Sequence, residues 1–410
     1  MVAAFIARRI AFNQQRSFSR FIIRLSTVAT AISVMVMILT LAFTNGFQAE
    51  VSNKVFSFLG HIRIQEKQPL KAIIAEEIPL EMNDTLEAEI RKNPAVRQVH
   101  PFSTKYAILK TSDELEGVLL KGYNANYDFS YLRRFITQGR PIEFNDSTYS
   151  REIMLSEYTA RQLNLKVNDR ILIYFIQPDG SPRPNKLTIT GLFKTGIEEY
   201  DRTFAVGDLR LIQRLNDWDS SEAGGYEIFL HNPKQIDQMV LSIYDMADFP
   251  LTWNTESIRD IAPNIFDWLD MQDLTRDVLI IIMIVVALIN LVSCLIILVL
   301  ERVRMVGVLK AIGARDSTIQ SIFLRHGLII TLTGIVAGTL LALGLIWLQQ
   351  ETGFIRLQEE AYYLSEAAVK IRYWEVLAIG GSTFLITLLV LLLPTLLVRR
   401  VKPVKAIRFN

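Results

Sequence analysis

Residues 301–315 of this 410-residue chain read Glu-Arg-Val-Arg-Met-Val-Gly-Val-Leu-Lys-Ala-Ile-Gly-Ala-Arg. They lie between two apolar runs, Val278–Leu300 and Gly327–Leu348, each long enough to cross a bilayer core of roughly 30 Å. Their pattern predicts a short helix between two membrane spans. One side is expected to carry Val306, Leu309 and Ile312–Gly313, and the other sides Arg302, Arg304, Lys310 and Arg315. Such a basic amphipathic helix can dock onto another protein and transmit a push, which is typical of the membrane half of a motor.

Four stretches contain no Asp, Glu, Lys, Arg or His, and each runs for 21 to 23 residues. They therefore qualify as transmembrane helices. The stretches are Leu25–Asn45, Val278–Leu300, Gly327–Leu348 and Val376–Val398. We assign the spans to 21–45, 278–300, 326–348 and 376–398. A cleaved signal peptide is a poor alternative for the first span, because Thr44-Asn45-Gly46-Phe47 is not a small-x-small cleavage site.

The charges outside the spans predict the orientation of the chain. Segments 1–24, 301–325 and 399–410 together carry 15 basic and 2 acidic residues, whereas 46–277 carries 26 basic and 35 acidic residues. Loop 349–375 is also acidic. Because basic loops stay in the cytoplasm, both termini and the 301–325 loop are predicted to be cytoplasmic. Residues 1–20 are expected to form an interfacial helix.

The external segment 46–277 is long enough for one large core or two smaller ones. Runs rich in β-branched and aromatic residues predict strands at His61–Gln65, Val118–Lys121, Ile171–Ile176, Lys186–Phe193, Thr203–Val206 and Tyr226–Leu230. Helical patterns occur at Thr85–Arg91, Glu157–Leu163, Asp208–Leu215 and Lys234–Met246. The predicted fold is therefore four transmembrane α-helices with a large mixed α+β domain inserted between the first and second spans.

A turn-rich segment, 177–185, separates two of these strands. Asp179-Gly180 favours a tight turn, and the neighbouring prolines remove hydrogen-bond donors. The simplest interpretation is a surface hairpin, and the alternative is a rigid arm that binds a soluble partner through Pro178, Asp179, Gly180, Pro182 and Pro184.

No motif for catalysis is found in the sequence. There is no phosphate-binding loop, and not even one Gly-Lys dipeptide, so the chain is not expected to hydrolyse ATP. We assign none of the four histidines to a metal, and the lone Cys294 can form no intrachain disulfide. The four uncharged stretches contain no acidic or basic group, which argues against an ion-coupled transporter.

Two faces of the spans are of interest. Gly334, Gly338 and Ala342 recur every four residues, which is typical of close helix packing. In the first span, Val36, Thr40, Phe43 and Phe47 share one side, which either faces lipid or lines a cavity for acyl chains.

The chain resembles the ABC permeases of the FtsX/MacB type, whose signature segment matches residues 301–314. Met305 stands where that pattern has Glu, within the expected docking surface. Within that superfamily the chain is most similar to the lipoprotein-releasing permeases of the LolC/LolE type. Four matches carry this resemblance in addition to the signature: Phe5–Arg9 with Thr44–Phe47, Gly191–Gly196 with Glu199–Asp201, Tyr362–Leu364, and Pro403–Arg408.

The resemblance implies a multi-pass protein of the inner membrane with a periplasmic domain. That domain would divide into a membrane-proximal part (46–110 and 225–277) and an inserted β-rich part (111–224). Two copies of a separate ATPase would bind ATP and Mg, with no cofactor in this chain. The resemblance assigns contact with the ATPase to Glu301, Arg302, Arg304, Val306, Gly307, Leu309, Lys310, Ala311, Ile312, Gly313 and Ala314.

By the same resemblance, the permease dimer extracts acylated lipoprotein from the outer leaflet and hands it to a periplasmic carrier. The first and second spans would border the lipid cavity. The 177–185 hairpin is shorter than the carrier-binding hook of LolC-type chains, which leaves open a homodimer or a LolC/LolE-like heterodimer. Two alternatives are a sibling permease for drug or peptide efflux or for control of a cell-wall hydrolase, and a membrane-anchored scaffold.

Overall fold

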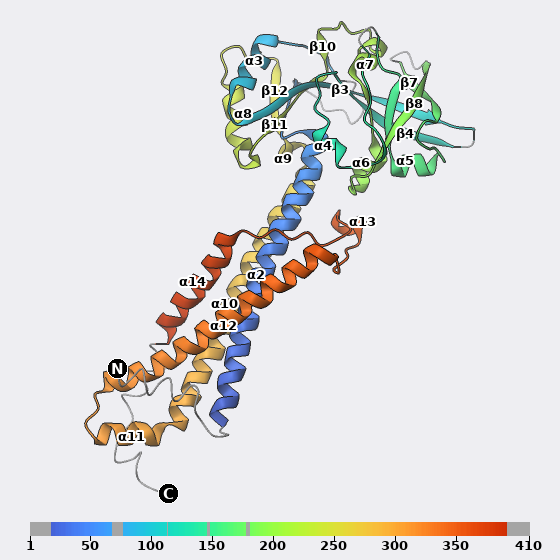
Figure 1. Cartoon of the computed structure of the whole chain (residues 1–410). Helices are drawn as coiled ribbons and strands as arrows, with labels where there is room; N and C mark the ends of the chain where they lie inside the picture. The colour runs from blue at the N-terminus through green and yellow to red at the C-terminus, as the bar shows by residue number, and fades with distance from the viewer. Residues whose placement is uncertain (1–17, 68–76, 113, 146–147, 178–180, 392–410) are drawn as a thin grey trace. The chain divides into compact units, whose positions relative to one another are not determined.

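The computed structural model describes residues 18–67, 77–112, 114–145, 148–177 and 181–391 (Figure 1). The interfacial helix predicted for residues 1–20 therefore lies outside the described residues, except for its last three. The described chain divides into two compact units. The helical unit contains the described parts of 1–49, 268–356 and 366–410, and the mixed unit contains those of 50–267 together with 357–365.

Four helices among the described residues are long and apolar enough to cross a membrane, as predicted. They are α2 (Phe18–Leu59), α10 (Pro263–Glu301), α12 (Asp316–Thr352) and α14 (Tyr373–Val390). The first two continue well past the apolar windows that predicted them. A short helix, α11 (Val303–Ala311), follows α10, which confirms the helix predicted within 301–315.

Small residues let the helices of this unit approach closely. The face that carries Gly334, Gly338 and Ala342 packs against α2, as expected for such a pattern. A Cβ on Gly334 would lie 2.8 Å from the Cβ of Thr30, and one on Gly338 would collide with the carbonyl oxygen of Ala31. Ala342 is fully buried in a cluster with residues of α2 and α14. The interpretation of this face as a packing surface is confirmed.

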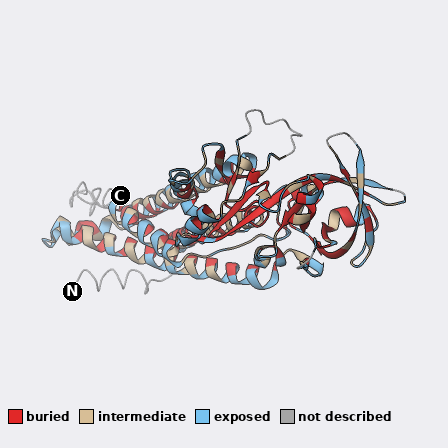
Figure 2. Cartoon of the chain, turned by 90° about the horizontal axis from the view of Figure 1, so that it is seen from above, coloured by how far each residue is buried: buried red, intermediate tan, exposed pale blue. Residues whose placement is uncertain are grey.

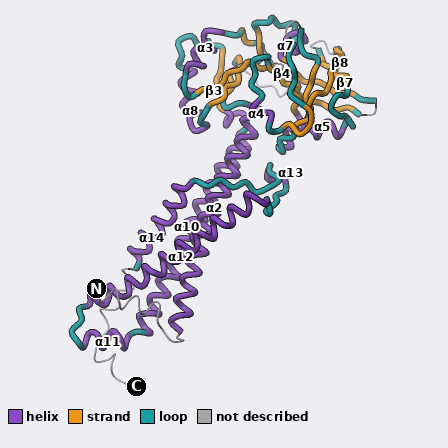
Figure 3. Tube along the Cα trace, in the orientation of Figure 1, coloured by secondary structure: helices purple, strands orange, loops and turns teal. Residues whose placement is uncertain are grey.

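The mixed unit contains a ten-stranded sheet, which confirms the prediction of mixed α and β structure (Figure 3). The strand order is β12-β1-β11-β3-β4-β9-β6-β8-β5, and β7 pairs with both β3 and β8. The strands are β1 (Ile62–Glu66), β3 (Val96–Lys110), β4 (Leu115–Tyr123), β5 (Ile136–Gly139), β6 (Glu152–Ser156), β7 (Arg170–Ile176), β8 (Pro182–Phe193), β9 (Phe204–Asp208), β11 (Gly225–Leu230) and β12 (Trp253–Ser257). A separate pair joins β2 (Leu80–Glu81) and β10 (Glu222–Ala223).

The mixed unit also contains short helices, and all four predicted helices are found. They are α3 (Asp84–Lys92), α4 (Ser130–Arg133), α5 (Glu157–Gln162), α6 (Glu198–Thr203), α7 (Leu209–Leu215), the 3-10 helix η1 (Pro233–Gln235), α8 (Ile236–Tyr244), α9 (Ile258–Ile261) and α13 (Glu359–Tyr362). Side chains from β3, β4, β6 to β9, α5 and α7 form one large buried cluster. Most of the sheet is buried, as Figure 2 shows.

Strand β8 begins earlier than predicted, at Pro182 instead of Lys186. Proline lacks an N–H and is therefore tolerated where a strand lies at a sheet edge. Pro182 and Pro184 pair only with β7, opposite Ile176 and Tyr174, whereas pairing of β8 with β6 begins at Thr188. The first part of β8 is thus an edge strand that can accept both prolines.

Candidate functional site

The α11 segment is held to the helical unit by an apolar cluster. Leu298 and Val299 of α10, Val306 of α11, and Ile319 and Phe323 of α12 are buried together. Leu309 and Ala314 pack against the same cluster. Because these contacts join α11 to the end of α10 and the start of α12, a displacement of α11 must also displace those two helices.

One sequence-based expectation about this segment is wrong, whereas the docking role expected at Met305 stays a prediction. Met305 is half-buried and packs against the apolar cluster, so an apolar side chain suits its position. Ile312, expected to lie on the side of Val306, is 78% exposed because the helix ends at Ala311 and the chain turns away. Only Val306 and Leu309 of the predicted apolar side face the cluster.

The exit from α11 is a tight turn braced by an ion pair. Gly313 has φ of +91°, a conformation that favours glycine, and its α-carbon faces open space. Across this turn, Lys310 Nζ lies 2.9 Å from Asp316 Oδ1 in the first turn of α12. The Lys310 side chain is only 10% exposed. It therefore stabilises the turn between α11 and α12, in addition to any contact with a partner.

The outer face of α11 is both basic and apolar. Arg304, Val308 and Ala311 follow each other at helical spacing and are exposed, and Glu301, the last residue of α10, is exposed as well. Ile312, Gly313 and Arg315 extend this exposed surface beyond the helix, whereas Gly307 is buried and Arg302 is half-buried. A surface of this kind fits a protein groove that offers apolar contacts and acidic side chains.

The four residues proposed to border a lipid cavity do share one face of α2. Val36, Thr40, Phe43 and Phe47 are all partly exposed, whereas Val34, Ile38 and Ala42 on the opposite side are buried. The same stripe continues toward the start of α2 as Phe21, Leu25, Val28 and Ile32, all about half exposed or more.

The segment Thr44-Asn45-Gly46-Phe47 joins α2 to three other parts of the helical unit. Asn45 Nδ2 donates to Glu375 Oε2 of α14 at 2.5 Å. A Cβ on Gly46 would collide with the carbonyl oxygen of Ala368, so only glycine permits this approach. The Phe47 ring packs edge-on against Trp268, with 5.1 Å between ring centroids. This four-residue motif therefore has a packing role in each of its last three positions.

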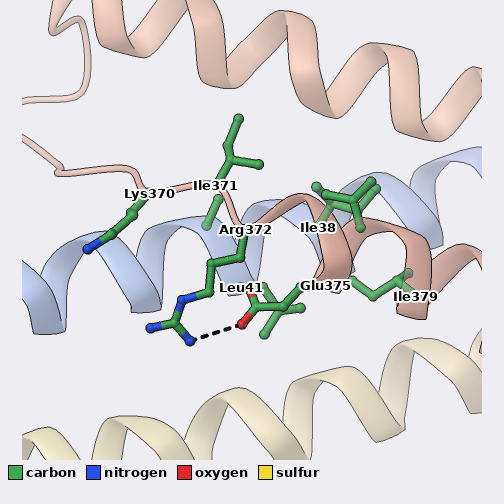
Figure 4. A pocket seen from close by; sticks show the side chains of 9 residues that line it. Ile38, Leu41, Lys370, Ile371, Arg372, Glu375 and Ile379 are labelled. Atoms are coloured by element: carbon green, nitrogen blue, oxygen red, sulfur yellow. Dashed lines mark hydrogen bonds and ion pairs between the residues drawn. The ribbon is translucent and has the colours of Figure 1, made fainter. Parts of the chain in front are cut away.

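Glu375 is a buried carboxylate that the sequence analysis did not single out. It lies in the first turn of α14, where a negative charge is favourable, and is 8% exposed. Arg372 Nη1 lies 3.2 Å from its Oε1 (Figure 4). The neighbouring cavity between Ile38, Leu41, Ile371 and Ile379 has a volume of about 10 Å³, which leaves space for about one water molecule.

A second buried charge cluster lies in the mixed unit at the end of α2. Lys121 of β4 and Glu227 of β11 have no exposed side-chain area, and their Nζ and Oε1 atoms lie 2.5 Å apart. Lys121 also donates to the carbonyl oxygen of Phe58, in the last turn of α2, and Arg63 Nη2 lies 2.9 Å from Glu227 Oε1. Burial lowers the pKa of Lys121 to about 8, although Glu227 opposes this effect.

This cluster holds the helix end against the sheet. The last carbonyl groups of a helix lack intrahelical donors, and a cation is favoured there. Lys121 provides both a donor and a cation to Phe58. Sequence reasoning missed these residues because a lone Lys or Glu in a strand is normally exposed. Only the strand order β1-β11-β3-β4 brings them together.

The segment Lys194-Thr195-Gly196 is organised by a buried carboxylate. Asp201 accepts hydrogen bonds from the Thr195 N–H and hydroxyl, both at 2.8 Å, and from the Gly196 N–H at 3.0 Å. Gly196 has φ of +74°. The sequence matches Gly191–Gly196 and Glu199–Asp201 therefore meet where the loop after β8 leads into α6.

The proposed carrier-binding hairpin is described only in part. Pro182 and Pro184 lie on β8, whereas Pro178, Asp179 and Gly180 lie outside the described residues. The ladder of β7 and β8 reaches Ile176 and Pro182, and Gln177 N–H donates to Ser181 C=O at 2.9 Å. The two strands are thus paired up to the base of the turn.

No group of His, Cys, Asp and Glu in the described part of the chain has the arrangement of a metal site. His61 has a packing role, because its ring stacks on Phe56 at 4.1 Å and its Nδ1 accepts the Leu230 N–H at 3.2 Å. Burial lowers the pKa of His61 to about 3, so this side chain is neutral at pH 7.

Two family models cover most of the chain. The MacB-like periplasmic core domain matches residues 25–243, and the FtsX-like permease C-terminal region matches residues 278–403. A solved structure, the periplasmic region of MacB from Actinobacillus actinomycetemcomitans, covers 51% of this chain and 95% of its own at 12% identity, with a TM-score of 0.34.

Curated relatives match from end to end. The lipoprotein-releasing system transmembrane protein LolC of Xylella fastidiosa is 22% identical, over 98% of this chain and 97% of the relative. The corresponding LolE protein of Haemophilus influenzae is 24% identical over 96% of both chains. LolC of Neisseria meningitidis serogroup B is 22% identical over 98% of both chains.

Proposed function

This chain belongs to the MacB-like periplasmic core domain family and carries an FtsX-like permease region, and from that premise we propose that it is the membrane subunit of a lipoprotein-extracting ABC transporter. A separate cytoplasmic ATPase, in two copies, binds ATP and Mg, while this chain performs no catalysis. A second permease chain, identical or of the LolC/LolE-like pair, completes the membrane part. The chain lies in the inner membrane with both termini in the cytoplasm.

The choice of a transporter driven by a partner is supported by α11. Its outer face presents Arg304, Val308 and Ile312, while its inner face packs against α10 and α12. ATP-driven closure of the ATPases would move this face, and the apolar cluster would pass the displacement to both helices. The turn at Gly313 and the Lys310–Asp316 pair make α11 and α12 move together.

The choice of lipoprotein as cargo is supported by the end-to-end similarity to LolC and LolE proteins. Extraction of an acylated protein needs an energy source, because exposing each CH₂ group to water costs about 0.8 kcal/mol and three acyl chains carry dozens of them. The partly exposed face of Val36, Thr40, Phe43 and Phe47 would contact acyl chains during extraction. A soluble periplasmic carrier would then receive the cargo at the β7–β8 hairpin.

Co-purification from native membranes tests this proposal. The complex should contain a cytoplasmic ATPase together with acylated lipoprotein. A complex that instead contains the same ATPase with a cell-wall hydrolase or an outer-membrane duct would show a sibling FtsX/MacB-type function. Absence of any ATPase would refute the transporter class. Two different permease chains in equal amounts would exclude the homodimer.

A further inference from the structure

The connection between α12 and α14 is a braced hairpin. At its base, the Leu357 N–H donates to Ser365 C=O and the Ala367 N–H donates to Ile355 C=O, both at 3.0 Å. The buried side chain of Gln349 accepts the Ile355 N–H at 2.9 Å and donates to Ala367 C=O at 3.0 Å. A connection held by these hydrogen bonds can transmit a displacement of α12 or α14 to its tip, whereas a flexible loop would deform instead.

The tip of this hairpin, residues 357–365, belongs to the same compact unit as 50–267. Lys194 Nζ and Glu359 Oε2 lie 2.5 Å apart, and Lys54 Nζ donates to the Tyr363 carbonyl oxygen at 2.5 Å. Leu364 is 6% exposed. An ion pair and a hydrogen bond therefore attach the tip to the rest of the mixed unit at two points.

The loop that receives the tip is shaped for close approach. A Cβ on Gly196 would lie 2.5 Å from Glu359 Oε1 and 2.7 Å from Lys54 Nζ, so any larger residue would displace both groups. Asp201, which is itself buried, fixes this loop through the Thr195 and Gly196 amides. These hydrogen bonds fix the receiving loop without any contribution from the hairpin.

We infer that this hairpin is a mechanical attachment of α12 and α14 to the mixed unit, with Lys54, Lys194 and Glu359 as its positioning residues. The inference rests on the proposed function. Helices α2 and α10 already continue into the mixed unit through the chain itself. The hairpin gives α12 and α14 their own connection to it, so motion of α11 and α12 reaches the mixed unit by two routes.

A zero-length carbodiimide crosslinker tests the attachment in the full-length protein. It condenses a lysine amine with a carboxylate that touches it, so tryptic peptides should contain a Lys194–Glu359 amide. The Lys310–Asp316 pair, at 2.9 Å, serves as the internal positive control. Formation of the control amide without the Lys194–Glu359 amide would overturn the inference.

Charge reversal tests the mechanical role in the complex with its ATPase. Lys194→Glu should lower lipoprotein release per ATP hydrolysed by roughly fivefold, the effect of losing an exposed ion pair at the upper end of its range. The swap Lys194→Glu/Glu359→Lys should restore release. Arg202→Glu is the matched control, since Arg202 is an exposed cation that pairs within its own helix with Glu198.

Full release by Lys194→Glu, or failure of the swap to restore it, would refute the mechanical role. A wild-type complex that hydrolyses ATP without releasing lipoprotein would instead count against the proposed cargo. In that case the crosslink still decides whether the hairpin is attached.

Discussion

Replacing Lys121 with Met tests the buried charge cluster at the end of α2. Met keeps an apolar stem of similar length but removes the ammonium group, which lies 2.5 Å from Glu227 Oε1 and donates to Phe58 C=O. Neither Lys121 nor Glu227 has exposed side-chain area, so water cannot replace the lost partner. Removing one partner of a buried ion pair costs about 3–5 kcal/mol.

We expect the lower end of this range, about 3 kcal/mol, because Arg63 Nη2 remains 2.9 Å from the same carboxylate. In a domain of this size, 1 kcal/mol shifts the melting temperature by about 2–4 °C. The melting temperature of the mixed unit should therefore fall by roughly 6–12 °C. Thermal unfolding of the full-length protein in detergent, followed by tryptophan fluorescence, measures this shift through the buried Trp253 of β12.

Two further variants make the test decisive. Lys186→Met, on the exposed edge part of β8, should change stability by less than about 0.5 kcal/mol. The double variant Lys121→Met/Glu227→Gln removes both buried charges and still leaves Arg63 an oxygen acceptor. Its loss in free energy of unfolding should therefore be smaller than the sum of the losses in the two single variants. A coupling of at least about 1 kcal/mol is expected for groups in contact. Strictly additive losses would refute the paired arrangement.

Three other perturbations follow from the structure. Lys310→Glu, or Gly313→Leu at φ of +91°, should disturb the turn between α11 and α12. Either variant should therefore abolish stimulation of the partner ATPase in reconstituted vesicles without affecting membrane insertion. Unchanged stimulation of ATP hydrolysis would contradict this prediction. Deletion of 179–184 should weaken carrier binding and leave ATP hydrolysis intact, and equal carrier pull-down from both forms would speak against the hairpin as the binding site. Burial lowers the pKa of His61 to about 3 and that of His100 to about 4. Below about pH 6.5 the unfolded chain therefore binds protons that the folded chain does not. The free energy of unfolding should be at its full value above about pH 6.5 and decline as the pH falls toward 4. Thermal unfolding at pH 7.5 and pH 5 measures this decline, which a His61→Gln/His100→Gln variant should largely lose.

The membrane helices and several short helices were predictable because each depends on a local pattern. The four apolar windows correspond to α2, α10, α12 and α14. In α8, Ile236, Met239 and Ile243 follow helical spacing and are all buried. The division of 46–277 into membrane-proximal and inserted parts stays a prediction, although β3 pairs with strands from both parts.

The long-range features were not predictable, because residues far apart in the chain create them. The 15-residue strand β3 was not predicted, because His100, Ser103 and Lys105 interrupt its apolar pattern. They are buried because distant segments contact them: His100 packs against Tyr127, Ser103 accepts from the Gly224 N–H, and Lys105 donates to Asn216 Oδ1. The inward position of Met305 depends likewise on the cluster with α10 and α12. No local pattern could reveal that the 357–365 tip belongs to the mixed unit.

The position of β1 in the sheet has a consequence for how the protein is made. Its two neighbours, β11 and β12, begin at Gly225 and Trp253, so about 160 residues must be synthesised after β1 before its first partner exists. At about 5–20 residues per second, the ribosome needs roughly 8–32 s for that stretch. During this time Ile62 and Ile64, which the finished protein buries completely, lie on a strand with two open edges. Substitutions that slow closure of the sheet should therefore reduce the yield of mature protein and leave the molecules that do fold fully active.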